Sequence, residues 1–127
     1  MQPISLPVKA ESVIQNRIVK KLRYLEWFVK ETHGNKYQSG FPDLYATHSI
    51  YQARWIEVKV ATQFSFTPAQ VKDLPKFNAN GSPVFILVDD TDEEYEKLFK
   101  PSNLQEYMAC YLDGCTNMIA WRAGRRK

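Results

Sequence analysis

Apolar side chains recur at steps of three and four residues in the first part of the chain: Ile14, Ile18, Leu22, Leu25 and Val29. This spacing predicts an amphipathic helix over residues 11 to about 30. Two prolines before it predict an irregular lead-in over residues 1–10. The polar segment 31–42, which contains glycines, predicts a loop or a short edge strand.

Short apolar segments predict strands over residues 43–47, 54–60 and 83–89. The last of them, PVFILVD, is continuously apolar, which is typical of a strand that is covered on both faces. The sequence HSIYQA supplies a turn between the first two strands. Residues 118–122 predict one more strand near the end of the chain.

Polar side chains mark the start of a helix after the second strand. Thr67 suits the N-cap position and Pro68 suits the first helical turn. Gln70 stands where a capping box has Glu or Gln. We therefore expect a helix to begin here, and Pro75 should kink or end it.

The motifs TDEE and SNLQ repeat the capping signature and predict short helices over residues 92–99 and 103–112. The Asn80-Gly81 step predicts a turn before the last long strand. The order of elements is helix, strand, strand, helix, strand and then small helices. A helix between two strands favours a crossover connection. The predicted fold class is therefore α/β, a small mixed β-sheet flanked by helices.

Composition adds limits rather than a function. The chain has 127 residues, so we expect a single domain over residues 1–127, with a basic tail at 123–127. No segment approaches the ~18 apolar residues of a membrane span, and no membrane partner is expected. Cys110 and Cys115 have no second ligand pair, so we expect reduced thiols, with a local disulfide as the alternative. The net charge of +3 only mildly favours an anionic partner.

Two opposite charges, Glu57 and Lys59, interrupt the predicted strand over residues 54–60. One interpretation is an edge strand whose charged face meets water, where such a pair contributes on the order of 0–1 kcal/mol. In the other interpretation, a hairpin brings Asp43 beside Glu57. Two adjacent carboxylates persist only with positive charge between them, and a divalent cation with oxygen ligands is the natural candidate.

These residues form a pattern that resembles a known family. Pro42-Asp43, followed by Glu57-Val58-Lys59, resembles the signature of the PD-(D/E)XK nuclease superfamily. With Gly40 before this motif, Glu11 on the first helix and Gln70 on the later one, the chain is most similar to the small VRR-NUC branch. The match spans about residues 11–88.

The resemblance implies a restriction-endonuclease-like core, α-β-β-β-α-β, whose additional strand would lie within residues 31–42. It implies Mg²⁺, with Mn²⁺ as a substitute, and these metal ligands: Glu11, Asp43, Glu57 and the carbonyl of Val58. It also implies that Lys59 orients the attacking water and stabilises negative charge in the transition state. Gln70 would hold Lys59 or the water in place.

Several of these residues also have structural explanations, which the sequence alone leaves open. Gln70 completes a capping box, and Glu11 suits the N-terminal end of a helix dipole. Asp43 fits a turn. The aromatic side chains of Tyr24, Trp27 and Phe28 are expected in the core rather than as platforms that stack on bases.

The function that the resemblance implies is a metal-dependent endonuclease that hydrolyses DNA. We expect its nucleic-acid face to contact phosphates through basic residues of the first helix and the loop after it: Lys20, Lys21, Arg23 and Lys36. The resemblance to small stand-alone nucleases implies branched DNA, such as a four-way junction, as the substrate. It also implies a homodimer and a location in the cytoplasm of a bacterial or phage-infected cell. The alternatives are a nuclease for flap, nicked or linear duplex DNA, or a non-catalytic DNA-binding protein with the same fold.

Overall fold

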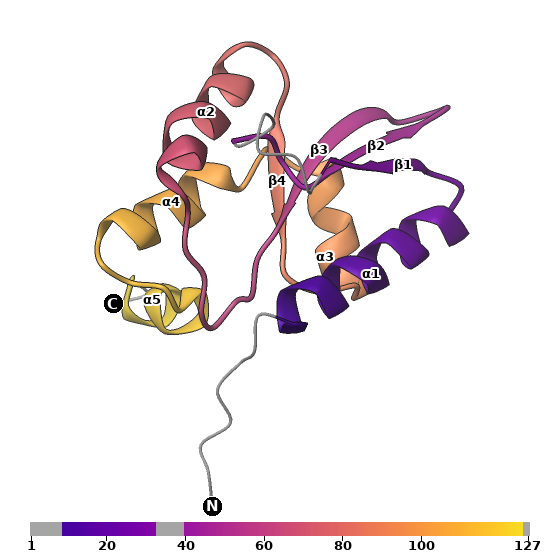
Figure 1. Cartoon of the computed structure of the whole chain (residues 1–127). Coiled ribbons are helices and arrows are strands. Elements are labelled where there is room, and N and C mark those ends of the chain that lie inside the picture. The colour runs from indigo at the N-terminus through magenta and orange to yellow at the C-terminus, as the bar shows by residue number, and fades with distance from the viewer. Residues whose placement is uncertain (1–8, 33–39, 126–127) are drawn as a thin grey trace, which may run out of the picture.

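A computed structural model describes residues 9–32 and 40–125 (Figure 1). Its elements, in chain order, are α1 (Lys9–Tyr24), β1 (Phe28–Glu31), β2 (Leu44–His48), β3 (Gln52–Val58), α2 (Pro68–Ala79), β4 (Val84–Leu87), α3 (Asp92–Glu96), the 3₁₀ helix η2 (Lys97–Phe99), α4 (Leu104–Leu112) and α5 (Met118–Arg125). The predicted order α-β-β-β-α-β is thus confirmed for the first six elements.

The strands form a four-stranded mixed sheet in the order β1-β2-β3-β4. The pairs β1–β2 and β2–β3 are antiparallel, and β3 runs parallel to β4. Helix α2 connects the two parallel strands, as the alternation of strand and helix predicts. The predicted α/β class with a small mixed sheet is therefore confirmed.

Helices cover the sheet from both sides, and β4 shows how the sequence achieves this. Phe85 and Leu87 pack into one apolar cluster with residues of α1, β1, β2 and η2. Val84 and Ile86 pack into a second cluster with residues of α2, α4 and α5. In Figure 1, α1 lies on one side of the sheet and α2, α4 and α5 lie on the other. The continuous apolar run of β4 is needed because both of its faces are buried.

Helix α1 ends at Tyr24, so the predicted helix through residue 30 is wrong at its C-terminal end. Glu26 adopts a left-handed conformation with φ 73°, and Trp27 N donates to Leu22 O at 2.9 Å. The left-handed residue after a helix is usually glycine. Because glutamate occupies this position here, the sequence offers no sign that the helix ends. The additional strand is β1 (Phe28–Glu31), which shares only Glu31 with the predicted range 31–42, so the predicted position is wrong. Residues 33–39 of that range fall outside the described structure.

The aromatic residues around this helix end divide between core and surface. Trp27 is buried in the core, as predicted. Tyr24 and Phe28 are 85% and 59% exposed, so the prediction of core positions is wrong for both. The helical periodicity of Leu25 and Val29 misled because the two residues reach the same core from a turn and from a strand.

The predicted strand over residues 118–122 is also wrong, because this segment belongs to α5. Met118 is buried while Ile119 is 65% exposed, which sets Met118 on the inner face of the helix. The side chain of Asn117 accepts a hydrogen bond from Ala120 N at 3.1 Å, as an N-cap residue does. Helix α5 continues to Arg125, so residues 123–125 of the predicted basic tail are helical.

The other predicted helices are confirmed. Thr67 and Gln70 form a complete capping box at the start of α2. The helix continues through Pro75 to Ala79, so Pro75 does not end it. Thr91 caps α3 by accepting a hydrogen bond from Glu94 N.

Side chains occupy the outer edge of β4, where none of the described strands pairs. Val84 N donates to Asn78 Oδ1 at 2.6 Å, and Val84 O accepts from Ser102 Oγ. Asn103 makes both contacts with Ile86, accepting from its N–H at 2.7 Å and donating to its carbonyl at 2.9 Å. The backbone groups of this edge are therefore satisfied by side chains instead of a neighbouring strand.

Two smaller expectations concern cysteines and membranes. Both Cys110 and Cys115 are free in the structure, and Cys110 is buried. None of the described helices is long and apolar enough to cross a lipid bilayer.

Candidate active site

The charged pair at the C-terminal end of β3 lies inside the protein: Glu57 belongs to the strand, and Lys59 follows it. Glu57 is 1% exposed and Lys59 is 5% exposed, and β3 runs between β2 and β4. The interpretation as a solvated pair on an edge strand is therefore wrong. Burial of charged groups is costly unless they are paired and hydrogen-bonded, so the surroundings of both side chains must compensate.

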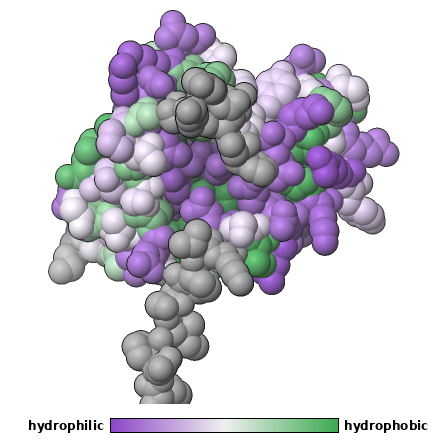
Figure 2. Space-filling model, in the orientation of Figure 1, coloured by the Kyte–Doolittle hydropathy of each residue, from purple (hydrophilic) through white to green (hydrophobic). Residues whose placement is uncertain are grey.

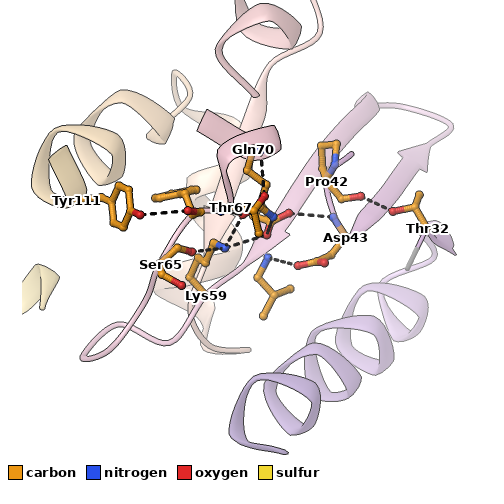
Figure 3. A network of polar contacts seen from close by, with 11 residues as sticks. Thr32, Pro42, Asp43, Lys59, Ser65, Thr67, Gln70 and Tyr111 are labelled. Carbon is orange, nitrogen blue, oxygen red and sulfur yellow. Dashed lines mark hydrogen bonds and ion pairs between the residues drawn. The ribbon is translucent and has the colours of Figure 1, made fainter. Parts of the chain in front are cut away.

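Asp43 and Glu57 lie side by side because of the hairpin register. Leu44 pairs with Ile56, so Asp43 falls opposite Glu57 just before β2 begins. Asp43 N donates to Glu57 Oε1 at 3.1 Å, and Val58 N donates to Asp43 Oδ2 at 2.9 Å. Each carboxylate is thus oriented by a backbone N–H of the other strand (Figure 3).

Gln70 has both of the functions that the sequence left open. Its Oε1 accepts from Thr67 N at 3.0 Å, which closes the capping box of α2. The same oxygen accepts from Lys59 Nζ at 3.2 Å, while Nε2 donates to Glu57 Oε2 at 2.8 Å. The start of α2 therefore fixes the amide that contacts both Glu57 and Lys59.

Lys59 is held from several directions. Its ammonium donates to Ser65 O at 2.7 Å and forms an ion pair with Glu57 Oε2 at 3.2 Å. It also lies 4.6 Å from the ring centroid of Phe66, within the range of a cation–π interaction. These contacts fix the ammonium beside the carboxylates. Sequence analysis missed Ser65 and Phe66, because neither a backbone carbonyl nor an aromatic ring face carries a motif.

The pKa values of Glu57 and Glu11 are raised at this site. Burial, and after it the charge of Asp43, raise the pKa of Glu57 to about 8, although the ammonium of Lys59 acts in the opposite direction. Burial also raises the pKa of Glu11, with the charge of Asp43 adding to this effect and Lys59 opposing it. Glu11 therefore belongs to the same electrostatic cluster, although it comes from α1 on the other side of the sheet.

The donor chemistry of this cluster fits a hard divalent cation. Asp43 and Glu57 offer carboxylate oxygens, and their mutual repulsion is relieved by a positive ion. Mg²⁺ requires only one or two carboxylates, with waters and phosphate oxygens completing its shell. Among residues 9–32 and 40–125, no three acidic, histidine or cysteine side chains meet in metal-binding geometry. The structure thus brings the carboxylate pair together without forming a three-carboxylate cluster that includes Glu11.

Gly40 packs the loop that presents Asp43 against α2. It has φ +91°, and a Cβ at this position would lie 2.6 Å from Asp73 Oδ2 and 3.2 Å from Ala69 O. Both the backbone conformation and the close approach favour glycine. Thr32 secures the other side of the loop by donating to the carbonyl of Pro42.

We expect Gly40→Ala to destabilise the protein by more than the ~1–2 kcal/mol of a left-handed alanine alone, because the new Cβ also meets Asp73. Gly81→Ala is the matched control, since Gly81 has φ +85° and no atom within 4 Å of the added Cβ. Urea unfolding measures the two free energies. Equal losses for both variants would show that the contact between Gly40 and α2 is unimportant.

The pKa of Glu57 predicts how stability depends on pH without a metal ion. Because this pKa is raised from 4.5 to about 8, the folded state holds the proton more tightly than the unfolded state. The contribution to stability is therefore complete below about pH 4.5 and is lost as pH rises to about 8. The loss is at most roughly 1.4 kcal/mol per pH unit.

Glu57→Gln should remove this dependence, whatever its absolute stability. Urea unfolding in EDTA at pH 5, 7 and 9 should show the free energy of unfolding falling more steeply for the wild type than for the variant. Parallel pH profiles would contradict the proposed protonation of Glu57.

The predicted phosphate contacts lie away from this cluster. Lys20 is exposed on α1, nine residues after Glu11, which places it ~14 Å further along the helix. Lys21 pairs with Asp92 at 2.6 Å, and Arg23 donates to Val29 O at 3.1 Å. Lys36 lies outside the described residues.

The surface around the site is polar. Figure 2 shows hydrophilic side chains gathered in the middle of the face, between the helices α2, α4 and α5 on one side and α1 on the other.

The order α-β-β-β-α-β and the acids on its adjacent strands define a class, the restriction-endonuclease-like α/β fold. A solved structure described as "VRR_NUC domain" is similar to this chain, with a TM-score of 0.59, 22% sequence identity, and coverage of 72% of this chain and 95% of that one. The fold is thus that of a VRR-NUC domain, as the motif predicts. No family model and no curated protein matches the sequence.

Proposed function

We propose that this protein is a metal-dependent endonuclease that hydrolyses phosphodiester bonds in DNA. The observation that supports this most strongly is the pair of the half-buried Asp43 and the buried Glu57, with the ammonium of the buried Lys59 beside it. A fold does not determine a function, so the argument rests on the chemistry of this cluster. The similarity to a VRR_NUC domain is consistent with it.

Asp43 and Glu57 would hold Mg²⁺, together with the carbonyl of Val58 and with Glu11 directly or through water. When bound, such an ion lowers the pKa of a water molecule and neutralises charge that develops on the phosphate. The half-buried position of Glu11 and its electrostatic coupling to Asp43 support a place in this shell.

The remaining groups act by position. Lys59 presents a fixed positive charge at the carboxylates, where it can donate a hydrogen bond to the attacking water or to a phosphate oxygen. Gln70 contacts both Glu57 and Lys59 and so sets the distance between them. Because this cluster is buried, each of these interactions is stronger than it would be in water.

We infer branched DNA, such as a four-way junction, as the substrate, and a homodimer as the active form. A symmetric dimer presents two equivalent sites to opposed strands. Lys20, Lys21 and Arg23 would contact phosphates outside the site. The affinity for DNA should then decrease steeply with increasing salt concentration.

A panel of labelled substrates tests this function. Four-way junction, flap, nicked and linear duplex DNA of matched sequence are incubated with the protein in Mg²⁺, Mn²⁺ or EDTA. Cleavage of the junction in Mg²⁺ but not in EDTA is expected. Faster cleavage of another substrate would replace the junction as the target, and binding without cleavage in either metal would favour a non-catalytic DNA-binding protein.

A further inference from the structure

Four aromatic rings form a cluster next to the carboxylates. Tyr45 and Trp55 have ring centroids 4.9 Å apart, and Phe41 lies 6.0 Å from Trp55. Phe77 of α2 completes the group at 5.5 Å from both Phe41 and Trp55. We call these four residues the aromatic cluster.

The aromatic cluster is on the same face of the sheet as the site. Tyr45 pairs with Trp55 across the hairpin. On the same face, Asp43 lies two residues before Tyr45, and Glu57 lies two residues after Trp55. Two residues of a strand span about 7 Å. This distance is comparable to one nucleotide of an extended strand, so a phosphate at the carboxylates places its neighbouring base near the rings.

The cluster is open to a ligand. Phe41 is 42% exposed, and Tyr45, Trp55 and Phe77 are half-buried. Helices α2 and α4 cover this face of the sheet at β4, whereas β1 forms the other end of the sheet. Lys30 of β1 pairs with Tyr45 and is exposed, which adds a positive charge beside the rings.

Trp55 and Phe77 pack against the second core cluster but stay partly exposed, which distinguishes the aromatic cluster from the fully buried Trp27. The indole N–H of the buried Trp27 donates to Tyr95 Oη at 3.1 Å. Within the described residues, neither the indole N–H of Trp55 nor the hydroxyl of Tyr45 makes a hydrogen bond, and no buried polar side-chain atom lacks a partner. Both groups therefore reach solvent, where they are available to a bound molecule.

We propose that the aromatic cluster stacks on an unpaired nucleotide next to the cleaved phosphate, with Lys30 contacting the adjacent phosphate. Aromatic rings beside a positive charge are the usual surface for single-stranded nucleic acid, because every base offers a face for stacking. This inference rests on the proposed nuclease function and adds that one nucleotide at the branch point is unpaired when the substrate is bound.

Fluorescence in EDTA tests the stacking independently of cleavage. Titration with a short oligothymidine should quench the tryptophan emission of the wild type and of Trp121→Phe. The quenching should be lost in Trp55→Phe, which keeps a ring and preserves packing. Equal quenching in Trp55→Phe and in the wild type, or no quenching at all, would overturn the proposal.

The affinity for the same oligonucleotide gives a second test. Tyr45→Leu should weaken binding by about 10-fold or more, as expected for loss of one stacking ring. Tyr45→Phe should retain most of the affinity, and Tyr24→Leu, at a ring 85% exposed on α1, is the matched control. Circular dichroism confirms that each variant is folded. Equal affinities of Tyr45→Leu and Tyr24→Leu would overturn the proposal.

Cleavage assays separate this inference from the function on which it rests. If the wild type cuts DNA and the two binding tests fail, the nuclease function remains and the aromatic cluster has no role in recognition. If no DNA is cut in Mg²⁺ or Mn²⁺, the nuclease function fails, and the fluorescence and affinity data alone decide whether the cluster binds an unpaired strand.

Discussion

Asp43→Asn should slow DNA cleavage by ~10³-fold or more, because a catalytic cation contributes several kcal/mol of transition-state stabilisation and each 1.4 kcal/mol changes the rate tenfold. Asparagine has nearly the same shape and keeps an oxygen that can accept from Val58 N, so the fold should persist. Only the negative charge at the carboxylate pair is removed. Single-turnover cleavage of the best substrate in Mg²⁺ measures the rate.

Two further measurements make this prediction specific. DNA affinity in EDTA should remain close to that of the wild type, and Mg²⁺ binding by calorimetry should weaken strongly. Asp113→Asn, at the C-terminal end of α4, is the matched control and should cut normally. An Asp43→Asn variant that retains a tenth of the wild-type rate would refute the assignment of Asp43 as a metal ligand.

Lys59→Met should reduce the cleavage rate by ~10²–10³-fold, the cost of removing one preorganised donor from a buried catalytic site. Methionine keeps most of the length and volume of the side chain and can still pack against Phe66. The ammonium lowers the pKa of Glu57, so its loss should raise that pKa further. Metal binding at pH 7 should consequently weaken and recover as the pH is raised.

The rate and the metal affinity should therefore be measured at pH 7 and pH 9. Lys100→Met, at an exposed position after η2, is the matched control. A rate that recovers fully at pH 9 would mean that Lys59 acts only through the protonation of Glu57. A persistent loss at saturating Mg²⁺ would agree with a direct contact of Lys59 with the reacting groups.

The carboxylate pair was predictable because the hairpin determines it. Once residues 43–47 and 54–60 pair, alternation and register place Asp43 opposite Glu57, and the turn between the strands leaves little freedom. Gln70 was also predictable from local sequence. The capping box fixes where α2 begins, and it also fixes the direction of the Gln70 amide. The ordered motif then indicated the fold.

Other features depend on contacts that the sequence does not encode locally. The chain leaves α1 through Glu26, a left-handed residue that is not glycine. Asn117 caps α5 just before the apolar run MIAW, which by itself resembles a strand. The carbonyl of Ser65 and the aromatic cluster are brought to the site only by tertiary packing. Spacing along one strand could not reveal rings that come from two strands, a loop and a helix.

The side chains on the outer edge of β4 have a consequence for assembly. An exposed edge strand is a template on which another chain can extend the sheet. Here Asn78, Ser102 and Asn103 already occupy the donor and acceptor positions that such a chain would use. A second copy could therefore extend the sheet through β4 only by displacing these side chains. The proposed homodimer would then use helices or the side of the molecule that β1 borders.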